Sequence, residues 1–486
     1  MVVPVSWEIF SLSVFVILVG YLCQLKYYST KSTLPCVRGL PFVGSTLSLF
    51  TSQDYFIELV NKYGAIFRIH ILGQDVVAVT KKEHISMLLN GENKFTFNSM
   101  PKIWQRVLGP NSLSVVTGTH HTNLKVLMKR AFSHEALNGY VPTIKKHFEQ
   151  FMKEKATTGE IWNVVPVTRK LFMGMALDIE MGTTMTAEEL LEFHTQFTDL
   201  FLGLAAVIPY ELPGTALKTS LNARKWIIER CTVIIEKRKQ RLANGESIPY
   251  DMLQHLIEDE VKGQKLSTDE IIDQMIVVIF ATLDTVASTI SNLLHNIQYV
   301  ATPDMVEKLY TEARGHQNID DIVWRKATSM PILEAFILET LRLTPPAGGG
   351  VRRINEDITL AGHQFKKDQA FLWMIGPAHQ DEALYSDPAQ FSPQRFLKSP
   401  WIDEQGAPSI TKGGAYTFLS FGGGTRLCLG QQLGQLMLRM FMTMFLRHHE
   451  YEVVGKSKPV FFPFTNKNIN VRMTYVADAQ QPQASN

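Results

Sequence analysis

The segment Phe421–Gly430 reads FGGGTRLCLG and places one cysteine, Cys428, in a glycine-rich loop. Glycines let a backbone approach a flat ligand closely and leave its amides free to point at sulfur. An amphipathic helix is predicted directly after the loop, over Gln431–Arg447, and a helix N-terminus favours a thiolate. Arg426, two residues before the cysteine, can pair with a ligand carboxylate. The pattern indicates either an axial ligand to a metal, with haem as the main candidate cofactor, or a turn around a structural cysteine.

The composition of the chain excludes several protein classes. Of the 486 residues, 45% are hydrophobic and 19% are charged, which argues against disorder and against a coiled coil. The formal net charge of +2 is too small for the electrostatic footprint of a nucleic-acid-binding protein. The sequence also predicts neither a zinc site nor a disulfide framework, because no CxxC pair occurs among its four cysteines, Cys23, Cys36, Cys231 and Cys428.

The N-terminal segment Trp7–Leu25 is apolar, and Glu8 is its one charged residue. Its length is close to the roughly 20 residues that a membrane-spanning helix needs. The first positive charge, Lys26, follows this segment, and the positive-inside rule therefore places the rest of the chain in the cytosol. The alternative is a signal sequence that is removed, although no basic residue precedes the apolar run.

These patterns predict a division of the chain into four parts. We expect a membrane anchor at residues 1–26, a Pro/Gly-rich linker at 27–44, one catalytic domain at 45–478 and a polar tail at 479–486. Within the catalytic domain, residues 65–72 and 76–79 are short β-branched runs that predict a hairpin. Helical periodicity predominates elsewhere, for example over Thr143–Lys155 and Asn222–Ala243, so the predicted body is mainly helical with few strands.

The longest predicted helix begins after Ser267 and continues to about Val300. Ser267 lies three residues before Glu270, which predicts a capping box. The stretch Met275–Ala281 is apolar on all sides but too short for a second membrane span, so we expect it to be buried in protein. A carboxylate there, Asp284, needs either a partner in the core or a chemical task, and the helix alone leaves both open.

The cysteine loop resembles the haem-thiolate signature F-x-x-G-x-R-x-C-x-G of the cytochromes P450. Its fixed positions are Phe421, Gly424, Arg426, Cys428 and Gly430. The resemblance implies a mainly α fold with small β-sheets, preceded here by one N-terminal transmembrane helix. It also implies haem b as cofactor, Cys428 as the iron ligand and NADPH-cytochrome P450 reductase as the electron donor.

Two further elements resemble the E-x-x-R and P-E-R-F motifs of this family. Glu339 and Arg342 belong to the first, and their i, i+3 spacing puts them on one helical face that ends before Pro345 and Pro346. Arg395 belongs to the second, in which Gln394 replaces the usual glutamate. By resemblance the three charged residues form a buried ion network with a structural role.

The segment Ala281–Thr285, ATLDT, resembles the oxygen-activating motif A/G-G-x-D/E-T on the long helix of the family. Asp284 and Thr285 would then be the catalytic residues that relay protons. Thr282 replaces the usual glycine, which normally eases a local widening of this helix, and Val286 replaces a second threonine.

Cations are expected to bind the haem propionates. By resemblance the candidates are Arg426 and Arg352, together with His121 and Lys125, which stand where the family has W-x-x-x-R. For His121 and Lys125, a solvated helix face is the alternative. Lys125, with the nearby Lys129 and Arg130, would also offer a basic patch to an acidic flavoprotein donor.

Within the family, the sequence is most similar to the retinoic-acid hydroxylases. This similarity is carried by short segments across most of the chain: Leu108–Gly109, Leu113–Ser114, Lys129–Leu137, Tyr140–Pro142, Leu212–Thr215, Asn222–Lys225, Glu339–Pro346 and Phe421–Gly424. It implies a pocket for a retinoid acid, with Trp104 as an apolar wall and Arg106 as a carboxylate partner, although the relatives' basic residue falls at Gln105. For Arg106, an ordinary surface position is the alternative. The further pocket candidates by family position are Phe280, Gly348, Gly349 and Phe464.

Three functional hypotheses follow. The first is a monooxygenase that hydroxylates a retinoid or a similar lipophilic acid, and the second is a sterol or steroid hydroxylase. The third, motivated by Thr282, is a haem protein that binds ligands or rearranges peroxides without a reductase. The resemblance implies contact with membrane lipid and a single-pass location, with the endoplasmic reticulum as the expected membrane and the catalytic domain facing the cytosol.

Overall fold

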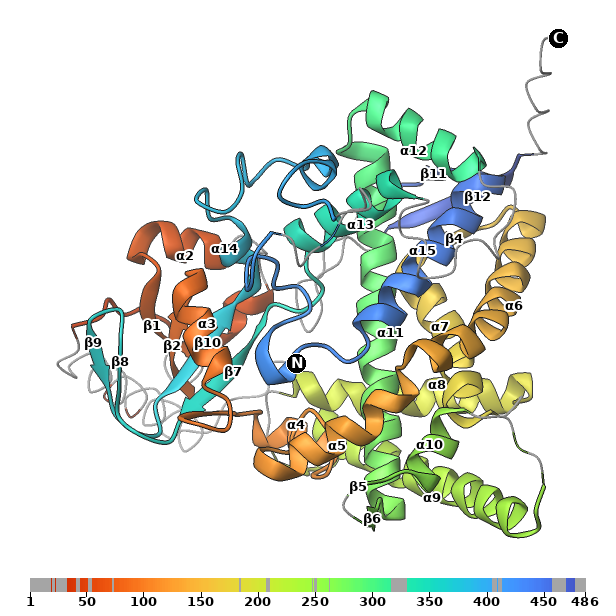
Figure 1. Cartoon of the computed structure of the whole chain (residues 1–486), viewed down its shortest axis with the longest axis horizontal. Coiled ribbons are helices and arrows are strands. Elements are labelled where there is room, and N and C mark those ends of the chain that lie inside the picture. Colours follow the sequence, from red (N-terminus) through yellow and green to blue (C-terminus); the bar gives the residue numbers. More distant parts are fainter. Residues whose placement is uncertain are drawn as a thin grey trace, which may run out of the picture. The chain divides into compact units, whose positions relative to one another are not determined.

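The computed structural model describes residues 19, 22, 33–40, 44–50, 55–71, 74–182, 185–206, 210–246, 248, 251–261, 263–315, 330–403, 409, 413–456 and 469–476. This part of the chain is mainly helical with small sheets, as predicted (Figure 1). It forms two compact units, of which the first combines Met1–Ser99 with Gly349–Ala378 and the second combines Met100–Gly348 with His379–Asn486. The predicted anchor lies outside the described residues except for positions 19 and 22.

The first unit is built on a five-stranded sheet with the order β1-β2-β10-β7-β3. Its strands are β1 Ile66–Ile71, β2 Gln74–Val79, β3 Thr96–Asn98, β7 Gly349–Ile354 and β10 Ala370–Met374. The antiparallel pair of β1 and β2 is the predicted hairpin, and alternate residues of β1, Phe67, Ile69 and Ile71, are buried. The sheet is accompanied by η1 Thr46–Phe50, α2 Tyr55–Tyr63, α3 Lys82–Asn90, β8 Ile358–Leu360 and β9 His363–Phe365.

The second unit contains most of the helices. They are α4 Lys102–Leu108, α5 Gly118–Ala131, α6 His134–Thr158, α7 Val164–Met181, α8 Ala187–Leu202, α9 Ala216–Ala243, α10 Met252–Glu258, α11 Thr268–Tyr299, α12 Pro303–Gly315, α13 Pro331–Leu343 and α15 Gln431–His448. A three-stranded sheet has the order β11-β12-β4, formed by His449–Val453, Asn470–Tyr475 and Ile161–Asn163. The shorter elements are η2 Gly203–Ala205, β5 Glu260–Val261, β6 Gln264–Lys265, η5 Pro393–Leu397 and η6 Gly424–Arg426, and α14 Ile375–His379 crosses the boundary between the units.

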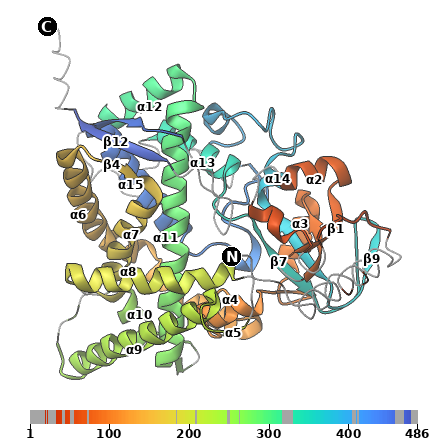
Figure 2. The same cartoon turned by 180° about the vertical axis from the view of Figure 1, so that it is seen from behind.

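Helix α11 runs through the whole second unit (Figures 1 and 2). It begins as predicted, because the Ser267 hydroxyl accepts from the Glu270 amide while the Glu270 carboxylate accepts from the Ser267 amide. Helices α7 and α15 pack along it, and Figure 2 shows α8 crossing it. Among the described residues, α11 is the one helix long and apolar enough to span a membrane, but 72% of its apolar window is buried in protein. It is therefore a core helix, in agreement with the prediction.

Helix α6 differs from its prediction. It begins at His134, nine residues before the predicted start, and continues through Pro142. The Ser133 hydroxyl accepts from the Ala136 amide and so caps the earlier start. A proline inside a helix removes one backbone hydrogen bond, but the buried side chains around it, among them Tyr140 and Ile144, offset that loss.

Candidate active site

The cysteine loop, residues 421–430, is closed by its own backbone. The Cys428 amide donates to the Phe421 carbonyl at 2.9 Å, and the Leu427 amide donates to the Gly424 carbonyl at 3.1 Å. Gly422 and Gly424 adopt φ values of +74° and +64°, which side chains with a Cβ rarely tolerate. Gly430 is the N-cap residue of α15, so the loop delivers the cysteine to the N-terminus of that helix.

Three groups around Cys428 stabilise its thiolate and so counter the effect of burial on its pKa. Desolvation raises the pKa of the thiol, whereas the backbone amides of Gly430 and Gln431 and the Lys125 ammonium lower it. The Cys428 side chain is nevertheless exposed on one side. Cys231 is the contrasting case, because it is fully buried on α9 and desolvation raises its pKa to about 12. Of these two thiols, Cys428 is the accessible one that is suited to ligate a metal.

Two predicted cofactor-binding cations brace the cysteine loop. Lys125 Nζ on α5 donates to the Thr425 carbonyl at 2.6 Å and to the Leu427 carbonyl at 2.9 Å. Arg426 donates to the carbonyls of Leu113, at 3.4 Å, and Val116, at 2.6 Å. The structure therefore brings the Lys125 ammonium to the cysteine loop from α5, and Arg426 connects the loop to Leu113 and Val116.

The remaining propionate candidates lie elsewhere. His121 is buried one turn before Lys125 on α5. Arg352 belongs to the first unit, where its Nε lies 3.1 Å from Glu92 Oε2 and its Nη1 donates to Asn98 Oδ1 at 3.0 Å. Arg352, on β7, thus forms a buried ion pair with Glu92 of the same unit.

Glu339, Arg342 and Arg395 meet in a buried ion network. Arg342 donates to both Glu339 oxygens, at 2.7 and 2.9 Å, and Arg395 Nε donates to Glu339 Oε1 at 3.0 Å. The side chains of Glu339 and Arg342 are 0% exposed. Arg342 also donates to the carbonyls of His379 and Pro388. The network therefore ties α13 to the irregular segment between α14 and η5.

His379 extends this network towards the cysteine loop, and sequence reasoning missed it. Its Nε2 accepts from the Leu419 amide at 2.8 Å, so Nδ1 carries the proton and donates to the Arg342 carbonyl at 2.9 Å. Burial lowers the pKa of His379 to about 3, which keeps the ring neutral. Because Leu419 lies two residues before Phe421, the histidine connects the ion network to the start of the loop.

Asp284 and Thr285 lie near the centre of α11. Asp284 Oδ1 is 3.1 Å from Nε of Arg169 on α7, a second residue that sequence reasoning missed. Burial raises the pKa of Asp284, and the Arg169 guanidinium lowers it. The sequence could have pointed to Arg169 only as a charged residue in the largely apolar segment Val164–Met181.

Helix α11 is regular around Thr282. Helix α11 is continuous from Thr268 to Tyr299, and the Thr285 hydroxyl donates back to the Ala281 carbonyl at 2.6 Å. Ala281 is exposed although most of the surrounding helix is buried. In the middle of α11, Ala281 and the Thr285 hydroxyl are therefore accessible and are not packed in the core.

Two of the predicted pocket residues, Trp104 and Phe280, belong to one aromatic cluster, which we call the aromatic wall. Trp104 on α4 contacts Phe280 on α11 edge to face, with ring centroids 6.2 Å apart, and Phe201 on α8 lies 5.0 Å from Phe280. The Trp104 indole donates to the Leu204 carbonyl at 3.0 Å and so has a fixed orientation. Phe201 was not among the sequence candidates.

The other pocket candidates are placed differently. Arg106 forms an ion pair with Glu211 and is 41% exposed, so its charge is already matched by a carboxylate of the protein. Gln105 donates to the Met100 carbonyl. Gly348 and Gly349 stand where the chain passes from the second unit to the first, and Phe464 lies outside the described residues.

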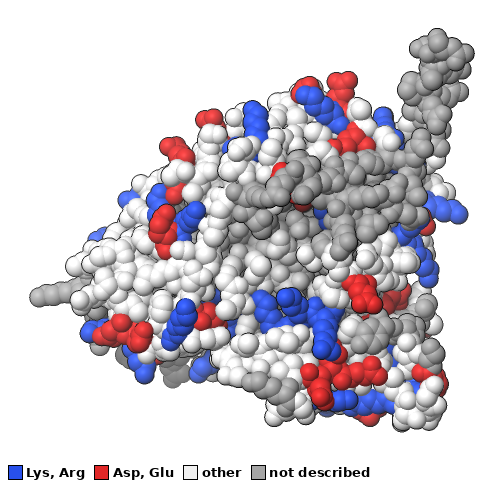
Figure 3. All heavy atoms as spheres, in the orientation of Figure 1, with Lys and Arg blue, Asp and Glu red and all other residues white. Residues whose placement is uncertain are grey.

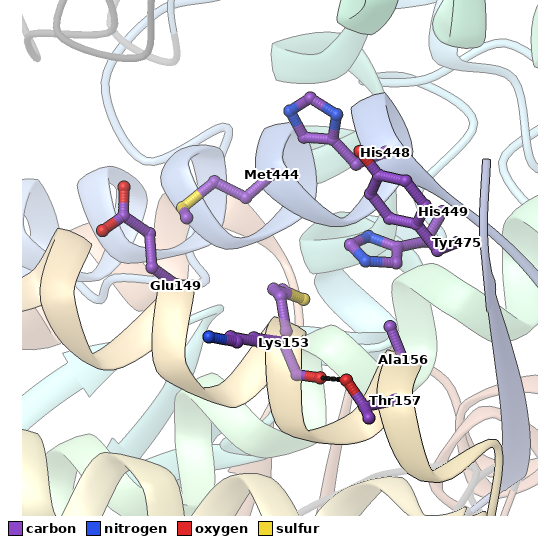
Figure 4. Close-up of a pocket in the computed structure, with 9 residues that line it drawn as sticks. Glu149, Lys153, Ala156, Thr157, Met444, His448, His449 and Tyr475 are labelled. Atoms are coloured by element: carbon purple, nitrogen blue, oxygen red, sulfur yellow. Dashed lines mark hydrogen bonds between the residues drawn. The ribbon is translucent and has the colours of Figure 1, made fainter. Parts of the chain in front are cut away.

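A surface groove at the other end of α15 is separate from this site (Figure 4). It is lined by Lys153 and Thr157 of α6, by His448 and His449 at the end of α15, and by Tyr475 of β12. Helix α15 has 18 residues. At 1.5 Å per residue its two ends are roughly 27 Å apart, so this groove does not belong to the cysteine loop.

The residues at the cysteine loop fit haem b. The donor set is a single accessible thiol. Burial raises its pKa, and two amides and an ammonium oppose that rise by stabilising the thiolate that an iron ligand requires. Glycines at 422 and 424 keep the adjoining backbone free of side chains, and Arg426 supplies a cation two residues from the sulfur.

Comparisons with known proteins agree with this assignment. The chain is 28% identical to cytochrome P450 26B1 of Xenopus tropicalis, over 91% of this chain and 87% of that protein. It is 27% identical to cytochrome P450 26A1 of Danio rerio, over 89% of each chain. A solved structure described as retinoic acid bound cyanobacterial CYP120A1 superposes with a TM-score of 0.78 at 25% identity, covering 91% of this chain and 99% of the other.

These relatives confirm the predicted resemblance to the retinoic-acid hydroxylase branch. The family model for cytochrome P450 matches residues 34–473, which is most of the chain. The protein therefore belongs to the cytochrome P450 family of monooxygenases, and its cofactor is haem b held by a cysteine thiolate.

Proposed function

We propose that this monooxygenase hydroxylates a retinoid-like lipophilic acid and that Cys428 is its iron ligand. The observation that carries the proposal is the accessible Cys428 thiol, which receives hydrogen bonds from the amides of Gly430 and Gln431 in a loop braced by Lys125. When bound, haem b supplies the oxygen activation and the oxidation of the C–H bond.

Asp284 and Thr285 hold and move protons in this proposal. Within the described part of the chain Asp284 pairs with one cation, Arg169, and its pKa is raised by burial, so the carboxyl group can carry a proton more readily than one with an ordinary pKa. The Thr285 hydroxyl is oriented by its bond to the Ala281 carbonyl, and its lone pairs remain available to accept a proton from water or substrate.

The substrate assignment draws on the aromatic wall and on the solved relative whose title names retinoic acid. Trp104, Phe201 and Phe280 offer an apolar surface suited to a polyene or a terpenoid ring. Because Glu211 already pairs with Arg106, an acid substrate would have to compete with that carboxylate. An uncharged sterol or steroid meets no such competition, and this observation supports it as the second candidate substrate.

A reductase-independent activity is the third candidate. It is favoured by the continuous α11 and by the engagement of the Thr285 hydroxyl with the helix backbone. In this candidate, a helix that is not widened at Thr282 would leave less room for proton delivery.

Electrons are proposed to come from NADPH-cytochrome P450 reductase. Figure 3 shows Lys and Arg side chains gathered on the face where α5 lies in Figure 1. On α5, Lys129 is exposed and Arg130 pairs with Asp259, while Lys125 is used by the cysteine loop. Lys129 is therefore the best placed of the three to meet an acidic partner.

The proposed cellular setting combines residues 1–26 as a single-pass anchor, 27–44 as a linker, 45–478 as the catalytic domain and 479–486 as a tail. The anchor would hold the enzyme in the endoplasmic reticulum membrane with the catalytic domain in the cytosol, where lipophilic substrates partition into the adjoining lipid. The charge pattern around Lys26 supports this orientation.

The test is turnover by the full chain with purified reductase, NADPH and a panel of retinoids and sterols. Hydroxylated retinoid, formed in proportion to NADPH consumed, is the expected result, and Cys428→Ala is the inactive control. Trp104→Ala should weaken substrate binding, measured by the substrate-induced spin-state shift, by about tenfold or more, because it removes a large, half-buried aromatic side chain. Product from sterols alone would establish the second candidate, and reaction without reductase the third.

A further inference from the structure

The chain between α4 and α5 is attached to the second unit through buried polar groups. We call residues 109–116 the strap. At its start, the Asn111 amide donates to Asp273 Oδ2 on α11 at 3.0 Å. The other Asp273 oxygen pairs with Arg224 of α9, and Arg224 also donates to the Val107 carbonyl at 3.2 Å. The Asp273 and Arg224 side chains are only 3% and 12% exposed, so this ion pair is shielded from water and salt.

The next residue of α11 continues the attachment. The Gln274 side chain accepts from the Leu113 amide at 2.8 Å and donates to the Asn111 carbonyl at 2.8 Å. Gln274 is 0% exposed, so these bonds are not exchanged with water. Two adjacent side chains of α11 therefore hold the backbone of Asn111 and Leu113 in one register.

Gly109 makes this close approach possible. Its φ is +102°, and a Cβ at this position would overlap the Asp273 carboxylate. Any other residue would displace the carboxylate from both of its partners, so a glycine is required where the strap leaves α4.

The far end of the strap is attached to the cysteine loop. Arg426 donates to the Leu113 and Val116 carbonyls, and Arg426 lies two residues before Cys428. Leu113 is bonded at both ends, because its amide is held by Gln274 and its carbonyl by Arg426. The strap also continues directly from α4, which carries Trp104.

We propose that the strap couples the aromatic wall of the pocket to the cysteine loop, with Asp273 and Gln274 as positioning residues. Because α4 continues into the strap, the bonds that hold the strap keep Arg426, and hence the backbone around Cys428, in register with Trp104. The same attachment holds Arg426 in place before substrate binds. The consequence for the haem rests on the proposed ligand role of Cys428, whereas the attachment itself does not.

The experiment is hydrogen–deuterium exchange of the haem-loaded full chain, in the peptides that cover residues 109–116 and 424–430. Asp273→Asn removes the charge that binds Arg224, and Gln274→Leu removes the two strap bonds without leaving a buried charge. Each variant should exchange about tenfold faster in the strap, and also measurably faster at the amides of Leu427 and Cys428. Asp269→Asn, an exposed acid one turn earlier on α11, is the matched control and should change neither peptide.

The outcomes separate the two proposals. Faster exchange in both peptides, together with at least a doubling of the fraction of reduced, carbon-monoxide-bound protein that lacks the thiolate spectrum, is the expected result. Faster exchange confined to the strap, or in neither peptide, would overturn the coupling. A wild-type protein without the thiolate spectrum would instead overturn the role of Cys428 while leaving the exchange result valid for the strap. If Asp273→Asn fails to fold, Gln274→Leu carries the same comparison.

Discussion

Two carboxylates on central helices of the second unit, Glu339 and Asp284, have opposite surroundings. Glu339 is 0% exposed and accepts from Arg342, from Arg395 and from the Ser392 amide. Asp284 is 13% exposed and pairs with Arg169 at 3.1 Å, and burial raises its pKa. A carboxylate held by two guanidinium groups in the core stabilises the fold, whereas a buried one with a raised pKa can exchange a proton. In the proposed function, this difference in partners separates the structural acid, Glu339, from the catalytic one, Asp284.

The largest effect is expected for Glu339→Gln. The substitution leaves Arg342 and Arg395 without a counter-charge in the core, and breaking such a buried pair costs about 3–5 kcal/mol. Urea unfolding of the haem-loaded protein should show this loss in the free energy of unfolding. Glu452→Gln, in the exposed pair with Arg472, is the matched control and should lose less than about 1 kcal/mol. Equal losses for the two variants would refute a structural role for Glu339.

Asp284→Asn should give the reverse pattern. Removing the proton carrier is expected to lower product formation about a hundredfold, whereas the free energy of unfolding should change by about 1 kcal/mol or less. The measurement is hydroxylated product per NADPH consumed with saturating reductase. Thr289→Ala, one turn further along α11, removes a hydroxyl that donates to the Thr285 carbonyl and is the control for helix disruption. If Asp284→Asn unfolds as readily as Glu339→Gln, the distinction between the two acids fails.

Arg169→Met should move the pH profile of turnover. The Arg169 guanidinium lowers the pKa of Asp284, so its removal leaves the effect of burial unopposed and raises that pKa further. The limb of the profile that reports Asp284 should therefore shift to higher pH, and Arg169→Lys should bring it back towards the wild-type position. An unchanged profile in Arg169→Met would mean that Asp284 does not limit proton delivery.

The last effect concerns a third carboxylate, Glu312, which accepts from the amides of Ile332 and Leu333 at the start of α13. Burial raises its pKa to about 7 from 4.5. Between these values the unfolded chain releases the proton that the folded protein keeps, so stability should fall as the pH rises, by at most about 1.4 kcal/mol per pH unit. Glu312→Gln should flatten this dependence in thermal unfolding scans, and an unaltered slope would contradict the assignment.

Patterns that repeat along one element were predictable from the sequence. The hairpin of β1 and β2, the capping box of α11 and the helix after Cys428 each depend on residues close together in the chain, where spacing alone fixes the geometry. Helix α6 was predicted to start too late because Pro142 resembles a helix boundary, whereas the apolar contacts that carry the helix through it come from other elements.

The partners of the site residues were not predictable in the same way. Arg169 reaches Asp284 from α7, and His379 bonds both Arg342 and Leu419, although these residues are far apart in the sequence. Nothing in the spacing of single charges shows which helix faces will meet, because that depends on how the whole core packs. The same limit applies to Arg106, which was predicted as a substrate partner and pairs with Glu211 in the structure.

The central claim is that Cys428 is the haem ligand, and the absorption spectrum of the reduced protein with carbon monoxide tests it most directly. The wild-type protein and Cys36→Ala, which alters a half-buried cysteine of the first unit, should both show the strongly red-shifted Soret band of a thiolate-ligated haem. Cys428→Ala should lose that band. If Cys428→Ala keeps the same red-shifted band, the iron ligand lies elsewhere and the site described around the cysteine loop is wrong.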